Sequence, residues 1–313
     1  MGQQTEQGAG CGGAGGGKES VLLDLELGAQ WPGYAYLDSG DGRRLERFGT
    51  VLLDRPAPQA LWPRGLSPAR WAEADARYLR RPDGGGDWIF AQGELPPWTV
   101  AWEGIRFEAK LTGFGHLGLF PEQMPNWQWL QERFARREAP SALLNLFAYT
   151  GAASLAAAHG GAAVTHLDAV KGVVQWASDN ARSDPAVEGR VRWIVDDASR
   201  FVARELRRGR RYDGIVLDPP TFGRGSQGQV WKLEEDLARL LAECFLLLSE
   251  DPELLLLSTH TPGVTPAVLR NLLRPLHQAR GGLLQAGEML LVSRESPHVL
   301  PSGAYCRWTP GAP

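Results

Sequence analysis

Hydrophobic and polar positions change rapidly along the first part of the chain, in short apolar runs separated by turn residues. The expected strands cover residues 21–27, 34–38, 45–49 and 50–54. The cluster DSGDG at 38–42 predicts a hairpin turn between two of them. Residues 1–19 are rich in Gly and Gln and cannot bury enough apolar surface to offset the entropy of ordering, so we expect a disordered tail there.

Residues 64–100 contain many Pro, Gly and Trp residues and predict irregular structure around one short helix, ARWAEADARYL, at 69–79. A hairpin formed by residues 98–104 and 105–112 is expected to follow. Tryptophans are dense here, namely Trp62, Trp71, Trp88, Trp98 and Trp102. Such residues more often supply core to a small, loop-rich domain than stack on bases, so we expect a structural role, with base stacking as the alternative.

After Asn126 the pattern changes to apolar runs that alternate with amphipathic stretches. The expected helices cover residues 126–138, 150–161, 172–183, 199–209, 233–250 and 265–279. The expected strands cover residues 141–147, 163–170, 190–198, 212–220, 253–260, 281–294 and 304–309. This alternation indicates βαβ units and a parallel sheet, whereas the last two strands, with no helix between them, indicate an antiparallel end.

We therefore expect an α/β fold with two domains after the tail. Residues 105–313 would form a doubly wound, mostly parallel, seven-stranded sheet, and residues 20–104 a smaller β-rich domain. In such a sheet a ligand binds at the carboxyl ends of the strands, near the point where the strand order reverses. The polar residues at those strand ends are therefore the candidates for a functional site.

The composition narrows the possible functions only slightly. The chain has 313 residues, of which 43% are hydrophobic and 22% charged, and its net charge is −3, which argues against a generally basic nucleic-acid binder but allows a local basic patch. The three cysteines, Cys11, Cys244 and Cys306, are far apart and predict neither a zinc site nor a disulfide framework. Without an apolar run of about 18 residues or a signal-peptide pattern at the start, we expect a cytoplasmic protein with no membrane span and no metal.

Four consecutive strand ends carry residues that suit a nucleoside ligand. Gly151 allows close approach of the backbone to a ligand at a helix N-terminus. Asp168 can accept hydrogen bonds from a ribose diol, and Asp197 can accept from the exocyclic amine of adenine while Ala198 offers its backbone N–H. Asp218 precedes two prolines, which stiffen the turn beside the reacting centre. A single Asp at a strand end is more often a helix cap, but four such signals together favour a ligand site.

At these residues the chain resembles the class I S-adenosylmethionine-dependent methyltransferases, in particular a bacterial subgroup related to large-subunit ribosomal RNA methyltransferases. The resembling motifs are NLFAYTG at 145–151, LDAVKG at 167–172, DDA at 196–198 and DPPTFG at 218–223. The resemblance covers residues 105–313 well and the preceding part more weakly. It is specific for the fold and the cofactor but not for the methyl acceptor.

The resemblance implies a role for each matching residue. The cofactor would be bound by Phe120, Gln123, Asn145, Phe147, Tyr149, Gly151, Asp168, Ala169, Asp197, Ala198 and Asp218. Among these, Phe147, Tyr149 and Gly151 would line the methionine end. The residues beside the transferred methyl group would be Asp218, Pro219, Pro220 and Phe222, and Phe222 could stack on a base.

Two departures from the family pattern restrict the chemistry. Members that methylate C5 of cytosine need a thiol nucleophile, and the corresponding segment here, Leu257 to His260, has no cysteine. We expect Cys244 and Cys306 to be structural. Members that methylate amino groups carry an aromatic residue directly after the two prolines, and here Thr221 intervenes before Phe222.

Ribosomal RNA is the acceptor that the resemblance favours. An arginine cluster at 204–211 could contact phosphates, but its position before the fourth strand puts it at the end of the sheet opposite the cofactor. His260 and His298 are expected on the cofactor's rim, as candidate bases or as capping residues. Two other functions remain open: a nicotinamide-dependent oxidoreductase, although the chain lacks G-x-G-x-x-G, and a non-catalytic module that binds RNA or protein.

Overall fold

The structure is a computed structural model that describes residues 31–311 except 83, 140, 183 and 225–227. The expected tail at 1–19 and the expected strand at 21–27 lie outside the described residues. Within the described part of the chain, no helix is both long and apolar enough to cross a membrane.

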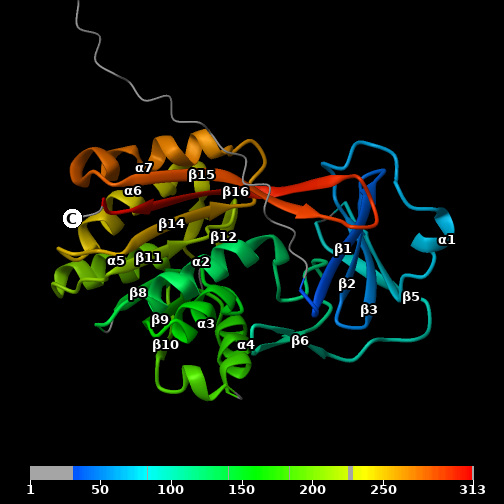
Figure 1. Ribbon diagram of the computed structural model, residues 1–313, viewed down its shortest axis with the longest axis horizontal. Coiled ribbons are helices and arrows are strands. Elements are labelled where there is room, and N and C mark those ends of the chain that lie inside the picture. The colour runs from blue at the N-terminus through cyan, green and yellow to red at the C-terminus, as the bar shows by residue number, and fades with distance from the viewer. Residues whose placement is uncertain (1–30, 83, 140, 183, 225–227, 312–313) are drawn as a thin grey trace, which may run out of the picture.

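The larger sheet has seven strands in the order β10-β9-β8-β11-β14-β16-β15 (Figure 1). Its strands are β8 (Ala142–Leu146), β9 (Ala163–Asp168), β10 (Val191–Val195), β11 (Gly214–Leu217), β14 (Leu254–Thr259), β15 (Leu283–Val292) and β16 (Val299–Thr309). The first five run parallel to one another, and β16 pairs antiparallel with both β14 and β15. The expected fold class is confirmed, and the strand order reverses between β8 and β11, where a ligand site is expected.

Helices cover both faces of this sheet, because the alternate residues of each buried strand point to opposite sides. Leu143 of β8 belongs to the apolar cluster on the side of α2 and α3, whereas Leu144 belongs to the cluster on the side of α5, α6 and α7. The helices are α2 (Met124–Ala135), α3 (Ala152–His159), α4 (Lys171–Ala181), α5 (Ala198–Arg207), α6 (Leu233–Leu247) and α7 (Pro266–Arg280), with 3-10 turns η1 (Pro121–Gln123) and η2 (Pro185–Val187).

The N-terminal part forms a five-stranded sheet in the order β1-β2-β3-β4-β5 and a separate β6-β7 hairpin. These strands are β1 (Tyr34–Gly40), β2 (Arg43–Phe48), β3 (Val51–Pro56), β4 (Ala76–Arg80), β5 (Gly86–Phe90), β6 (Trp98–Trp102) and β7 (Ile105–Ala109). The helix expected at 69–79 is wrong in its second half: α1 spans only Pro68–Trp71. Residues that follow it pair with β3 and β5 as strand β4, so sheet pairing overrides the helical propensity of this Ala-rich stretch.

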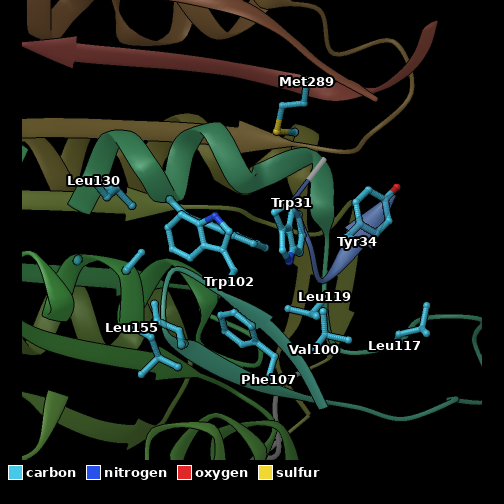
Figure 2. Close-up of a cluster of buried hydrophobic side chains, with 14 of the residues drawn as sticks. Trp31, Tyr34, Val100, Trp102, Phe107, Leu117, Leu119, Leu130, Leu155 and Met289 are labelled. Carbon is cyan, nitrogen blue, oxygen red and sulfur yellow. The ribbon is translucent and has the colours of Figure 1, made fainter. Parts of the chain in front are cut away.

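One apolar core joins the two parts of the molecule (Figure 2). Trp31, which precedes β1, packs edge-on against Trp127 of α2 with ring centroids 6.2 Å apart, and Trp102 of β6 packs on the same ring at 5.7 Å. The structural role expected for the tryptophans is confirmed for Trp102 and for Trp71, which are buried.

The predicted boundary between residues 104 and 105 coincides with the turn of the β6-β7 hairpin. The division into two domains stays a prediction.

The turn that joins β15 to β16 also holds the N-terminal sheet in place. The Ser293 hydroxyl donates a 2.6 Å hydrogen bond to the Leu37 carbonyl oxygen, and the Glu295 carboxylate lies 3.5 Å from the Arg70 guanidinium. These contacts, added to the shared core, put the N-terminal sheet beside the carboxyl ends of the parallel strands (Figure 1).

Candidate cofactor and acceptor site

The turn between β8 and α3 has an unusual backbone. Phe147, Tyr149 and Gly151 all have positive φ angles, of 56°, 50° and 94°. Aromatic residues rarely adopt this left-handed conformation, which costs on the order of 1–3 kcal/mol at each residue and occurs mostly at functional sites. The turn persists because its neighbours hold it: the Ala148 amide donates to the Leu167 carbonyl oxygen at 3.0 Å, and the Asn180 side chain donates to the Thr150 carbonyl oxygen at 3.0 Å.

This turn lines two adjoining cavities at the carboxyl ends of the strands. The larger, which we call the main cavity, has a volume of about 510 Å³, and the smaller lies beside α2 and has about 50 Å³. Both are lined by Phe120, Phe147, Tyr149 and Asp218. The remaining candidates from the sequence line one of the two: Gln123, Asn145 and Gly151 the smaller, and Asp168, Ala169, Asp197, Ala198, Pro219, Pro220 and Phe222 the main cavity. The fold thus brings every candidate cofactor and catalytic residue to one place.

The two strand-end aspartates on β9 and β10 have different local partners. Both carboxylate oxygens of Asp168 accept backbone hydrogen bonds at 3.0 Å, one from Tyr149 and one from Val170. Burial raises the pKa of this carboxyl above its usual range, against the effect of these hydrogen bonds. Asp197 caps α5, where it accepts a 3.0 Å hydrogen bond from the Arg200 amide. Each aspartate therefore has a structural role, and each retains acceptor capacity toward the main cavity.

Asp218 follows β11 and is fixed from one side only. The Gln123 side-chain amide donates to Asp218 Oδ2 and to the Ser258 hydroxyl, both at 2.9 Å, while Asn126 donates to Gln123 Oε1 at 2.7 Å. Asp218 Oδ1 is buried and accepts no hydrogen bond from the described residues. A buried carboxylate oxygen that accepts no hydrogen bond is suited to receive a donor from a bound molecule.

His260 lies between two carboxylates at the edge of the main cavity. Its Nδ1 is 3.6 Å from Asp218 Oδ1, and its Nε2 is 3.2 Å from Glu122 Oε1. Burial alone would lower the pKa of His260, but the Asp218 and Glu122 carboxylates overcome burial and raise that pKa to about 10. Burial likewise opposes ionisation of Glu122, yet the neighbouring His260 and Arg44 cations lower its pKa to about 2. His260 is therefore a cation at neutral pH and a hydrogen-bond donor, not a base.

The sequence interpretation needs two corrections here. His298 does not face this rim: its ring lies against Trp62, with centroids 5.7 Å apart, and 3.7 Å from the Asp38 carboxylate in the N-terminal sheet. The reason is that the β15-β16 connection folds over the N-terminal sheet. Glu122 was not identified from the sequence, although an acidic residue in the largely apolar segment that precedes α2 could have drawn attention to it.

A short hairpin that the sequence did not predict covers the outer wall of the main cavity. It comprises β12 (Phe222–Arg224) and β13 (Val230–Lys232). The Trp231 indole donates a 2.8 Å hydrogen bond to the Pro220 carbonyl oxygen, which ties the hairpin to the two prolines. The Phe222 side chain lines the cavity and remains 52% exposed, so its ring is available to a molecule that enters from solvent.

Comparisons with known proteins agree with this geometry. A family model described as S-adenosylmethionine-dependent methyltransferase matches residues 61–298. A crystal structure of a SAM-dependent methyltransferase from Agrobacterium tumefaciens is 37% identical, covers 89% of this chain and 90% of its own, and has a TM-score of 0.86. The chain belongs to the family of S-adenosylmethionine-dependent methyltransferases, enzymes that take the transferred methyl group from this cofactor.

Two further comparisons show the range of the similarity. The ribosomal RNA large subunit methyltransferase K/L of Hahella chejuensis is 34% identical over 153 residues, which are 48% of this chain and 20% of that protein. The chain thus spans about a fifth of the length of this relative. A structure of SMU.776 complexed with SAH is 19% identical, covers 93% of this chain and 76% of its own, and has a TM-score of 0.67, a likeness of fold.

Proposed function

We propose that this chain methylates RNA, with ribosomal RNA as the favoured acceptor, and that it does so without a cysteine nucleophile. The similarity to the ribosomal RNA large subunit methyltransferase K/L of Hahella chejuensis supports an RNA acceptor. The observation that carries the proposal is the exposed Phe222 ring beside Asp218 on one wall of the main cavity. A half-exposed aromatic ring can stack on an unpaired base at the position where the base must reach the methyl group.

The lining of the two cavities suits S-adenosylmethionine. Asp168 would accept from the ribose hydroxyls, and Asp197 with the Ala198 amide would bind the adenine. The small residues that follow Gly151 let the backbone of the α3 N-terminus approach the methionine end, where Phe147 and Tyr149 also lie. Asn145 and Gln123 would bind polar atoms of that end, while Phe120 and Ala169 pack against the cofactor.

The bound cofactor supplies an electrophilic methyl group on a sulfonium, so positioning provides most of the rate. Asp218 Oδ1, which accepts no hydrogen bond from the described residues, would accept one from the acceptor atom and orient it toward the methyl group. Pro219 and Pro220 hold this carboxylate in a stiff turn. The cationic His260 lies 3.6 Å from Asp218 Oδ1 and stays out of the proton transfer.

A covalent adduct through a cysteine is disfavoured by where the described thiols lie. Cys244 and Cys306 are fully buried in α6 and β16. Burial raises the pKa of Cys306 to about 12 and that of Cys244 still further, so neither forms a thiolate at neutral pH. We further propose that the chain acts in the cytoplasm and that the transfer needs no metal ion.

The test is transfer of a tritiated methyl group from S-adenosylmethionine to total RNA from a strain that lacks the protein, followed by mapping of the labelled nucleotide. Label in ribosomal RNA with the wild-type protein, and a loss of at least 100-fold with Asp218→Ala, is the expected result. RNA from the parent strain, already methylated, is the control substrate. Label only in protein or small metabolites would refute the RNA acceptor. If cells that carry Asp218→Ala showed the same phenotypes as wild-type cells, a non-catalytic module would be favoured.

A further inference from the structure

A second pocket opens beside the main cavity, between the N-terminal sheet and the segment that leads into α2. It has a volume of about 230 Å³. Residues of β2, β3 and β4 form one wall, and the pocket adjoins the main cavity, because His116, Phe120 and His260 line both. The pocket therefore lies next to the place where an acceptor molecule would meet the methyl group.

Three arginines from neighbouring strands give this pocket a positive character: Arg44 of β2, Arg55 of β3 and Arg80 of β4. Among its described lining residues Glu122 is the single carboxylate, and it lies 3.2 Å from His260 Nε2. We call the site the arginine pocket. Burial, then the two nearby arginines Arg55 and Arg44, lower the pKa of His116 to about 4, so His116 adds no charge.

The three arginines differ in how many donors they leave free. Arg55 is fully engaged: its Nε and Nη2 donate to Glu46 Oε2 at 2.9 and 2.6 Å, and its Nη1 donates to the Gly115 carbonyl oxygen at 3.0 Å. Arg44 Nε lies 3.0 Å from the same Glu46 oxygen. Glu46 therefore orients two guanidinium groups, and Glu122 is a second carboxylate whose charge acts on Arg44.

Arg44 and Arg80 both present donors that an anion could accept from. Across the part of the chain that the structure describes, the terminal nitrogens of Arg44 donate to no protein acceptor, although the Arg44 side chain is only 14% exposed. Arg80, at the end of β4, is exposed and forms no ion pair with a described residue. Guanidinium donors match the oxygens of a phosphate, and both arginines line the same pocket.

We propose that the arginine pocket binds a backbone phosphate of the acceptor RNA next to the nucleotide that is methylated. The inference rests on the proposed function, because an RNA chain whose base stacks on Phe222 in the main cavity carries phosphates on either side of that base. The N-terminal sheet thus contributes directly to acceptor binding. It does so through Arg44 and Arg80, while the core packing of its other residues keeps these two arginines facing the methyltransferase site.

The test compares Arg44→Gln and Arg80→Gln with the control Arg106→Gln, which alters an exposed strand arginine of β7 that lines neither cavity. With RNA from the deletion strain as substrate, each pocket variant is expected to raise KM about ten-fold. The slope of log affinity against log salt should fall by about one, and S-adenosylmethionine should bind within two-fold of wild type. Arg106→Gln should match wild type in all three measurements.

An unchanged KM and salt slope in Arg80→Gln would overturn the proposal. This variant breaks no side-chain hydrogen bond or ion pair between described residues, so it should fold. Calorimetric titration with inorganic pyrophosphate tests the pocket without RNA, and Arg80→Gln is expected to weaken its binding at least five-fold. If the wild-type protein methylates no RNA, the proposed function fails. The pyrophosphate titration then decides by itself whether the arginine pocket binds phosphate groups. Equal pyrophosphate affinity of wild type and Arg80→Gln would then refute it.

Discussion

Replacing His260 by glutamine should change how the stability of the protein depends on pH. The substitution removes a cation from between Asp218 and Glu122, whose carboxylate oxygens lie 3.6 and 3.2 Å from the ring nitrogens. The folded-state pKa of His260, about 10, lies above the unfolded value of 6.5. The histidine therefore stabilises the fold fully below pH 6.5, and this contribution is lost as the pH rises through 10.

The magnitude follows from the same pKa difference. Each pKa unit corresponds to about 1.4 kcal/mol, so the interval between the two values sets an upper limit on the order of 5 kcal/mol. The His260 side chain is 29% exposed, and solvent screening reduces the expected contribution to about 2–3 kcal/mol. We expect His260→Gln to lower the free energy of unfolding by this amount at pH 6 and by much less at pH 10.

Urea denaturation at several pH values between 6 and 10 measures this effect, provided that unfolding is reversible and two-state. The matched control is His277→Gln on α7, which removes an imidazole that lines none of these cavities. The stability difference between wild type and His260→Gln should shrink as the pH rises. A difference that stays constant across the range would refute the assignment of His260 as a cation held by the two carboxylates.

Three further predictions concern the cofactor, the acceptor and the fold. Asp168→Asn should weaken S-adenosylmethionine binding at least ten-fold in calorimetry, because the amide has one acceptor oxygen where the carboxylate has two; unchanged affinity would contradict its ribose role. Phe222→Ala should raise KM for RNA by about ten-fold and leave cofactor affinity unchanged, as expected for loss of one base stack; a matching loss of cofactor binding would argue against it. Gly118→Ala should lower the free energy of unfolding by about 2–4 kcal/mol, because Gly118 has a φ of 93° and a Cβ there would lie 2.3 Å from the Trp176 ring. Thermal unfolding measures this loss. The control Gly172→Ala has free space around its Cβ and should not destabilise the protein.

Most of the large sheet could be predicted because its strands and helices have distinct local patterns. The apolar strand 254–259 and the amphipathic helix 266–280 are examples, and each lies where its period indicated. The failures are short elements whose partners are distant in sequence. Residues 76–80 form a strand because β3 and β5 pair with them, and the β12-β13 hairpin packs through Trp231 onto the prolines.

For the candidate site, the sequence predicted the set of residues but not their connections. Strand ends point to Asp168, Asp197 and Asp218, because parallel strands must end at one edge of the sheet. No local pattern could show that Glu122 and His260 form an ion pair, since the two residues are 138 positions apart in the sequence. The placement of His298 was wrong for the same reason.

The sequence by itself determined the fold class, the strand ends and the cofactor motifs, because the spacing of apolar residues and the residue types at turns are local properties. Only the tertiary structure decided which charges meet. The N-terminal sheet brings Arg44 and Arg80 beside the main cavity, and η1 brings Glu122 to His260. These contacts depend on how separate elements pack around the shared core, and side-chain distances of 3 to 4 Å between them are encoded in no single segment of the chain.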